Sequence, residues 1–223
     1  MLEMFLAGTF RKLMNLFFQL LYHQLAWLYD LVSWSVSLGQ WQHWILTPLP
    51  YLKQDTILEL GYGPGHLQKA AHRQSYSIFG LDRSPQMAKI AGKRLRKSQY
   101  QPRLAIGDAR ALPYAEHSIG QIVATFPSEY FLDPLTLKEA HRVLKSEGEL
   151  IVVPMAWMRG KTPVHMLLGW VFKITGQSLD KEHPLFEQGI QFMAEHGFEA
   201  SLQTRELRNS EVLILIASKK TKT

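Results

Sequence analysis

Along most of this chain, segments with the apolar pattern of a β-strand alternate with segments that have the pattern of an α-helix. From Lys53 onward, short apolar, β-prone runs at 57–60, 77–81, 103–106, 119–126 and 149–153 predict five strands. The pairs Ser84-Pro85 and Asp133-Pro134 each place a capping side chain before a proline at the first helical position. They predict helices over 84–97 and 133–144, and residues 67–73 begin another. This alternation predicts a parallel sheet with helices on both faces.

The end of the chain breaks this rhythm. Two strand-like runs, 198–206 and 211–218, are joined by the short segment 207–210, which predicts an antiparallel hairpin. The run 149–153 is nearly all apolar after a turn at Glu147-Gly148, so we expect a central strand there. The predicted fold class is therefore α/β: a Rossmann-like doubly wound sheet, mostly parallel, with an antiparallel C-terminal hairpin and additional N-terminal helices.

Residues 1–50 have a different character. No formally charged side chain lies between Lys12 and Asp30, where Phe, Leu, Tyr and Trp dominate. Polar residues recur at helical spacing, which predicts an amphipathic helix with a broad apolar side. They also interrupt an apolar span shorter than the ~20 residues of a transmembrane helix. Two interpretations stay open, a helix that covers the site of a 51–223 domain and a helix whose apolar face enters a bilayer interface.

Composition narrows the classes of function. The absence of cysteine excludes disulfides, thiolate zinc sites and cysteine nucleophiles, and it fits a reducing cytosol. A net charge of +6 is a modest basic bias. Most of the cations between residues 83 and 110 fall on a predicted helix and its flanks, where we expect a solvated face. At 223 residues, the chain is long enough for one domain with a substantial core.

The candidate chemistry lies where the predicted parallel strands end. Three glycines, at 61, 63 and 65, follow the first strand, and such a turn lets a backbone approach a nucleotide-like ligand closely. Acidic residues stand at the ends of three successive strands: Glu59, Asp82 and Asp108. An acid about 20 residues after the glycines can accept hydrogen bonds from ribose hydroxyls. Because ligands bind beyond the carboxyl ends of such strands, we expect the three acids to line one crevice.

Four segments carry more specific motifs. They read Glu-Leu-Gly-Tyr-Gly-Pro-Gly at 59–65, Gly-Leu-Asp-Arg-Ser-Pro-Gln-Met at 80–87, Gly-Asp-Ala-Arg-Ala-Leu-Pro-Tyr at 107–114 and His-Arg-Val-Leu-Lys-Ser-Glu-Gly at 141–148. Together they resemble the class I S-adenosylmethionine-dependent methyltransferases, within the methyltransferase type 11 group that includes the ubiquinone and menaquinone biosynthesis methyltransferases. The last segment departs from the usual Arg-Val-Leu-Lys-Pro-Gly-Gly at Ser146 and Glu147, in a predicted turn.

The resemblance implies that S-adenosyl-L-methionine is the cofactor. Glu59 and the glycine backbone would hold its methionine end, Asp82 its ribose, and Asp108 its adenine amine. A carboxylate-lined cleft suits a sulfonium cation better than a phosphate cradle would. The cofactor-binding residues implied in this way are Glu59, Gly61, Gly63, Gly65, Asp82, Arg83, Met87, Asp108 and Ala109.

Transfer of a methyl group requires nucleophile, carbon and sulfur to be held in line, an effect worth up to ~7–11 kcal/mol in well-oriented systems. The candidate bases near the acceptor are Glu129 and His66, with Tyr130 as an orienting group. Helix capping or surface exposure explains these three residues equally well. The segment 126–130 lacks the Asn-Pro-Pro-Tyr pattern of amino-group methylation, which argues against nucleic acid and glutamine as acceptors.

The acceptor is expected to be a small, apolar molecule, lipid-like or quinone-like. The N-terminal segment and residues 155–175 are rich in Trp, Leu, Met and Phe, and Arg159 and Lys161 are candidates for contacting a polar or anionic head. We expect no nucleic-acid partner, and peripheral membrane contact through residues 1–30 is one of the two open interpretations. The expected location is cytoplasmic, with the inner membrane face as the alternative.

Other functions fit less well. A methyltransferase-like module that binds the cofactor without activity remains an alternative, although all three acids are retained. A nicotinamide-dependent oxidoreductase is disfavoured by His66 at the third glycine position of its fingerprint and by the lack of a Tyr-x-x-x-Lys pair. A phosphate-binding loop before Lys161 would need glycine where Met155 stands, and no HExxH metal motif or Gly-x-Ser-x-Gly elbow is present.

Overall fold

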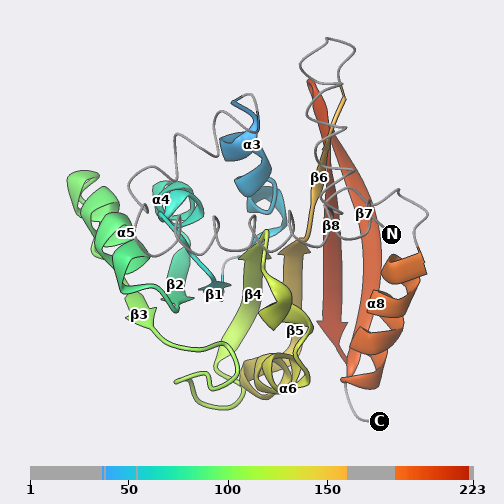
Figure 1. Ribbon diagram of the computed structural model, residues 1–223. Coiled ribbons are helices and arrows are strands. Elements are labelled where there is room, and N and C mark those ends of the chain that lie inside the picture. Colours follow the sequence, from blue (N-terminus) through green and yellow to red (C-terminus); the bar gives the residue numbers. More distant parts are fainter. Residues whose placement is uncertain (1–36, 38, 54, 160–183, 221–223) are drawn as a thin grey trace, which may run out of the picture.

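The computed structural model describes residues 37, 39–53, 55–159 and 184–220 (Figure 1). The helix expected before residue 30 and most of segment 155–175 lie outside the described residues. The division into a 1–50 region and a 51–223 domain therefore stays a prediction.

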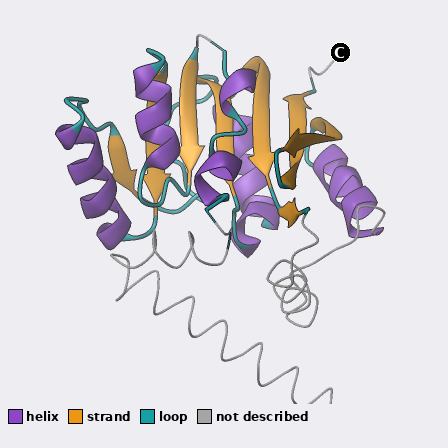
Figure 2. Cartoon of the chain, turned by 90° about the horizontal axis from the view of Figure 1, so that it is seen from above, coloured by secondary structure: helices purple, strands orange, loops and turns teal. Residues whose placement is uncertain are grey.

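One mixed sheet organises the described part of the chain (Figures 1 and 2). Its first five strands, in the order β3-β2-β1-β4-β5, are parallel, which confirms the predicted doubly wound arrangement. β8 then pairs antiparallel with β5 and β6, and β7 pairs antiparallel with β8. The strands are β1 (Thr56–Leu60), β2 (Ser77–Asp82), β3 (Leu104–Ile106), β4 (Ile119–Thr125), β5 (Leu144–Val153), β6 (Ala156–Met158), β7 (Phe198–Leu207) and β8 (Ser210–Lys219).

Helices flank this sheet. Ser84 accepts from the Met87 N–H and Asp133 from the Leu135 N–H, so both predicted caps form and each is followed by a proline in the first turn. The helical elements are α3 (Trp41–Ile45), η2 (Leu49–Tyr51), α4 (His66–Arg73), α5 (Pro85–Lys97), η3 (Glu129–Leu132), α6 (Pro134–Val143) and α8 (Pro184–Glu195).

Alternating residues of the strands feed two apolar cores, one on each face of the sheet. On one face Ile57 packs in a cluster with residues of α3 and α4. On the other face Leu58 and Leu60 pack in a cluster with residues of α6 and with Met193 of α8. α4 also contacts α5, which lies at the β3 edge (Figure 1). The sheet is therefore enclosed on both faces along β1 and β4, and its strand ends remain available for a site.

The antiparallel C-terminal hairpin is confirmed, but two element boundaries differ from the prediction and one strand was missed. β5 begins at Leu144 rather than after Gly148, because the expected turn is an irregularity within the strand. Between two successive register pairs β4 advances from Ile119 to Gln121 while β5 advances from Leu144 to Glu149. The short strand β6 was not predicted, and the connection between β7 and β8 is only the pair 208–209.

The chain reverses direction sharply where β4 ends. Phe126 has a φ of 48°, a left-handed conformation that is rare for a bulky residue. Its ring packs on Trp41, with ring centroids 4.7 Å apart, and lies 6.1 Å from the Trp44 ring. The Trp44 indole N–H in turn donates to the Ser210 hydroxyl at 2.8 Å. α3 is thus fixed both to the end of β4 and to the start of β8.

Candidate active site

The glycine turn after β1 has the backbone that glycine permits. Gly61, Gly63 and Gly65 have φ values of 70°, 49° and 79°, in the left-handed region. The Gly61 N–H donates to the Leu81 carbonyl at 2.7 Å, which joins the end of β1 to the end of β2. A Cβ added at Gly63 would meet no atom within 4 Å, so this part of the turn borders open space.

Asp82, the last residue of β2, holds the loops on either side of it. Its Oδ2 accepts from the Gly63 N–H and its Oδ1 from the Ser84 N–H, each at 2.8 Å. Burial raises the pKa of the Asp82 carboxyl, against the effect of these two hydrogen bonds. The Asp82 carbonyl also accepts from the Gly107 N–H at 3.0 Å. One residue therefore connects the turns after β1, β2 and β3.

Glu59 lies beneath the glycine turn, enclosed between the sheet and α4. Only 1% of the residue is exposed, and its Oε2 accepts from the Gln68 side-chain amide at 2.8 Å. Burial, the dominant effect, raises the pKa of Glu59 to about 8, and the neighbouring Asp82 charge raises it further, against the hydrogen bond from Gln68. Gln68 also donates to the Phe79 carbonyl, while its Oε1 is buried without a hydrogen-bond partner in the described structure.

Asp108 lies at the same edge of the sheet, after β3, and it is engaged by arginines. The Arg110 guanidinium donates to both carboxylate oxygens, at 3.0 and 2.7 Å, and the Arg110 N–H donates to Oδ1 at 3.0 Å. Arg83 approaches Oδ2 to 3.6 Å. These contacts lower the pKa of Asp108 to about 2, and the hydrogen bonds from Arg110 have the largest effect. The carboxylate is therefore ionised at all physiological pH values and is already paired.

The remaining residues that the resemblance implied have varied surroundings. Met87 is 1% exposed, so its side chain is enclosed by the protein rather than presented to a ligand. Ala109 is buried beside Asp108, whereas Arg83 is exposed. Tyr62, between the first two glycines of the turn, is 3% exposed, and its ring occupies the space beside Gly80.

Of the three candidate catalytic residues, Tyr130 contacts the start of the glycine turn through its side chain. Its hydroxyl donates to the Leu60 carbonyl at 3.3 Å and lies 2.8 Å from where a Cβ on Gly61 would be. His66 is the half-buried first residue of α4. Glu129 begins η3, and its side chain lies outside the described part of the structure.

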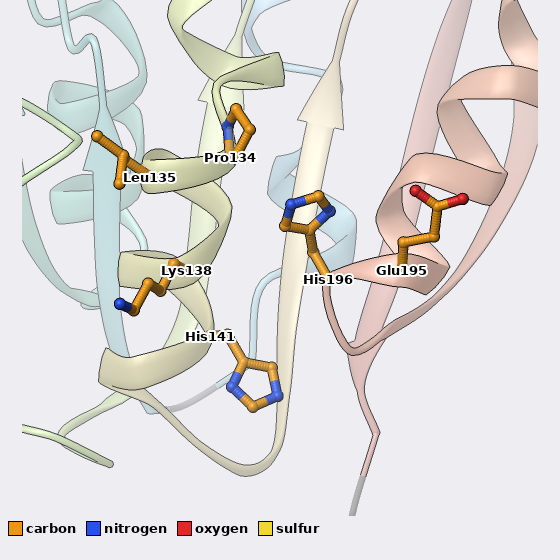
Figure 3. Close-up of a pocket in the computed structure, with 6 residues that line it drawn as sticks. All are labelled: Pro134, Leu135, Lys138, His141, Glu195 and His196. Atoms are coloured by element: carbon orange, nitrogen blue, oxygen red, sulfur yellow. The ribbon is translucent and has the colours of Figure 1, made fainter.

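A concave region of the described surface lies between two helices and does not include this edge. It is a shallow depression of about 360 Å³ between α6 and the end of α8 (Figure 3). None of the predicted site residues lines it. The side chains around it are Pro134, Leu135, Lys138, His141, Glu195 and His196.

Comparison with known proteins bears on the family and the fold of this chain. Residues 58–152 match the family model of a methyltransferase domain. The chain is 27% identical over 206 residues to a demethylmenaquinone methyltransferase of Thermotoga maritima, covering 82% of this chain and 88% of that protein. It is 26% identical to the ubiquinone/menaquinone biosynthesis C-methyltransferase UbiE of Geotalea uraniireducens, covering 59% of this chain and 60% of that protein.

These matches identify a methyltransferase domain, and the chain is similar to the class I S-adenosylmethionine-dependent methyltransferases. Its fold agrees with this, since a putative S-adenosyl-L-methionine-dependent methyltransferase of Methanococcus maripaludis superposes with a TM-score of 0.62. The two chains are 19% identical, and the match covers 89% of this chain and 93% of that one. This methyltransferase spans only part of some relatives, as the 60% coverage of the Geotalea protein shows.

Two contributors to this edge, Gln68 and Arg110, were not singled out from the sequence, and Arg159 has protein partners that were not expected. Gln68 donates to Glu59 and Arg110 donates to Asp108. Arg110 stands within the 107–114 segment, but no role was assigned to it there. Arg159, expected near an anionic head group, is paired instead with Glu206 at 2.7 Å and Glu211 at 2.5 Å. Its charge is thus neutralised within the protein, and Lys161 lies outside the described residues. No helix in the described ranges is long and apolar enough to cross a bilayer.

Proposed function

We propose that this methyltransferase binds S-adenosylmethionine across the turns after β1, β2 and β3 and methylates a small, apolar, quinone-like acceptor. The hydrogen bond from the Gly63 N–H to Asp82 carries the cofactor part of this proposal. It fixes the open glycine turn and the acid suited to ribose side by side, where one nucleoside can reach both.

The residues at this edge fit a nucleoside that bears a positive sulfur. Open space beside Gly63 leaves room for a ligand close to the backbone. Each oxygen of Asp82 accepts one amide N–H, so lone pairs remain for the two ribose hydroxyls. Asp108 offers an acceptor for an exocyclic amine once Arg110 turns aside. Glu59 supplies a carboxyl whose ionisation a nearby cation would favour.

The bound cofactor supplies a methyl group on a positively charged sulfur. In this proposal the Tyr130 hydroxyl, beside Gly61, orients the acceptor at the end of β1. Methylation at a carbon forms a carbon–carbon bond and releases a ring proton, which His66 or Glu129 would accept. Holding the acceptor in line with the sulfur supplies most of the acceleration, because no covalent intermediate on the protein is required.

The acceptor is inferred from the relatives and from the composition of the chain. The two curated relatives are named for demethylmenaquinone and for ubiquinone/menaquinone biosynthesis. The tryptophan- and phenylalanine-rich segment before residue 37 precedes α3, whose Trp41 and Trp44 pack at the end of β4. An apolar ring suits such surroundings better than a charged amine does.

The test is methyl transfer from labelled S-adenosylmethionine to a short-chain demethylmenaquinol analogue, with a soluble amine as comparison. We expect label on the quinol and none on the amine, and an Asp82→Asn variant that folds normally should lose most of the transfer. Label on the amine alone would refute the proposed quinone-like acceptor. Binding of S-adenosylhomocysteine without transfer to any acceptor would favour an inactive binding module.

A further inference from the structure

The basic residues of this protein are concentrated in one part of the fold. Residues 61–107, which form the glycine turn, α4, β2, α5 and β3, contain nine of the 25 Lys and Arg residues but only one of the 19 Asp and Glu residues, Asp82. This part of the chain therefore carries a larger positive charge than the whole protein, whose net charge is +6. The single acid is half-buried at the site, so it does not neutralise the surface.

Six of these cations are exposed on the outer sides of α4 and α5, and we call them the basic face. Lys89, Lys93 and Lys97 are spaced four residues apart and form a stripe along α5. Like charges at this spacing repel each other, and no carboxylate is paired with any of the six within the described structure. The basic face consists of Lys69, Arg73, Lys89, Lys93, Arg96 and Lys97.

The position of the basic face relates it to the apolar N-terminal sequence. α4 contacts both α5 and α3, so the three helices cover the same side of the sheet. The chain enters the described structure at residues 37–40, immediately before α3. The uncharged stretch between Lys12 and Asp30 is thus joined to the helix next to the basic face by only ten residues. The apolar stretch is therefore close in sequence to α3, which lies on the side of the sheet that carries the cations.

We propose that the basic face docks on an anionic phospholipid surface. Spread cations close to an apolar segment are what a peripheral membrane protein requires, because each cation near the surface adds affinity and the apolar side chains enter the interface. Single-stranded nucleic acid would need exposed aromatic rings for stacking. On this side of the fold Tyr100 is half-buried and already stacked on His72, with centroids 5.3 Å apart. A membrane is therefore the better partner for this surface.

The test compares two triple variants of the full chain that remove the same charge. K89Q/K93Q/K97Q neutralises the α5 stripe, and glutamine keeps the helix propensity of lysine. The matched control, K138Q/R208Q/K220Q, neutralises three exposed cations elsewhere on the described surface. Sedimentation with vesicles of phosphatidylcholine, alone or with about one third phosphatidylglycerol, is measured at about 0.1 M and about 1 M salt.

We expect the wild-type chain to bind the anionic vesicles at low salt and to dissociate at high salt. The α5 variant should bind about 100-fold more weakly, at about fivefold per charge, and the control should stay within about threefold of wild type. Equal loss in both variants, equal binding to neutral vesicles, or no vesicle binding by wild type would overturn the proposal. Tighter binding to an oligonucleotide than to anionic vesicles at the same salt would overturn it in favour of nucleic acid.

This proposal does not depend on the proposed acceptor. Lys89, Lys93 and Lys97 belong to no part of the cofactor edge, so methyl transfer to the short-chain demethylmenaquinol analogue, measured without vesicles, should be unchanged in the α5 variant. Loss of that transfer together with vesicle binding would mean that the variant is misfolded, and the unfolding transition of each variant checks this. Wild-type-like melting with selective loss of vesicle binding is the result that supports docking through α5.

Discussion

Glu59 is a carboxyl that the fold keeps protonated at neutral pH. Its pKa is raised to about 8 by burial beside β1, whereas in the unfolded chain it stays near the usual value of 4.5. Between these two values the folded chain binds a proton that the unfolded chain releases. The contribution of Glu59 therefore lowers the free energy of unfolding progressively as pH rises from about 4.5 to about 8, and it is constant above that.

Glu59→Gln should remove this pH dependence. The amide oxygen of the introduced glutamine can still accept from Gln68, so the variant should gain stability relative to wild type at about pH 8.5 and gain little at about pH 5. Urea unfolding at both pH values measures the difference. Glu199→Gln, at an exposed position of β7, is the control and should shift stability equally at both. A Glu59 variant that is destabilised equally at both pH values would contradict the protonated carboxyl.

Arg110 competes with any ligand for the Asp108 carboxylate. The carboxylate must release at least one guanidinium hydrogen bond before an adenine amine can donate to it. Arg110→Gln should therefore bind S-adenosylhomocysteine several-fold more tightly than wild type, with the difference shrinking at high salt. Asp108→Asn should bind about tenfold more weakly, because a charge-assisted hydrogen bond is lost. Titration calorimetry tests both, and weaker binding by Arg110→Gln would instead make Arg110 a ligand contact.

At the scale of elements, the turn from β1 into α4 contains two glycines with different structural roles. A Cβ at Gly63 would face open space, whereas a Cβ at Gly65 would lie 2.8 Å from the Ala91 Cβ of α5. Both residues have positive φ, so alanine costs about 1–2 kcal/mol of conformational strain at either position. Only Gly65 additionally keeps α4 and α5 in contact.

Alanine substitutions should separate these roles. Gly63→Ala should lower the free energy of unfolding by about 1–2 kcal/mol and abolish most S-adenosylhomocysteine binding, because its methyl group enters the ligand space. Gly65→Ala should destabilise the fold by more than Gly63→Ala, since the helices must also move apart. Chemical denaturation and calorimetry of the two variants provide the comparison. If the two variants were equally destabilised and Gly63→Ala still bound S-adenosylhomocysteine, the ligand would have to bind elsewhere.

The elements of this fold were largely predictable because each strand and helix carries its own local signal. Apolar runs defined the parallel strands, and the Ser84-Pro85 and Asp133-Pro134 caps defined where α5 and α6 begin. The start of β5 was not predictable, since Glu147-Gly148 has the composition of a turn and Glu147 does have a φ of 61°. Pairing with β4 resumes only after this irregularity, which is a property of the sheet and not of the segment.

At the scale of the whole molecule, the sequence predicted that the ends of β1, β2 and β3 lie at one edge of the sheet, but not the hydrogen bonds that join them. Asp82 and Asp108 come to one edge because parallel strands end together, as the topology requires. The charge states of the acids could not be read from the motifs. Glu59 is protonated because it is buried, and Asp108 is held ionised by hydrogen bonds from Arg110. Arg110 stands in the 107–114 segment, but its sequence position does not show that its side chain bonds to Asp108. Exposure is likewise a tertiary property, so the packing of Met87 and Tyr62 inside the protein could not be read from their positions in the motifs.

Ligand-induced stabilisation of the whole chain distinguishes the methyltransferase site from a nicotinamide site. A ligand that binds only the folded state at about 100 times its dissociation constant adds about 2.7 kcal/mol to the free energy of unfolding. For a chain of this size that corresponds to a rise in Tm of about 5–10 °C. S-adenosylhomocysteine should produce this rise, and NAD should produce none, because the third glycine of the dinucleotide fingerprint is replaced by His66. Asp82→Asn should lower the response to S-adenosylhomocysteine, whereas Glu199→Gln should preserve it. A rise with NAD would mean that the edge of β1, β2 and β3 accepts a dinucleotide, and the cofactor proposed for this site would then be wrong.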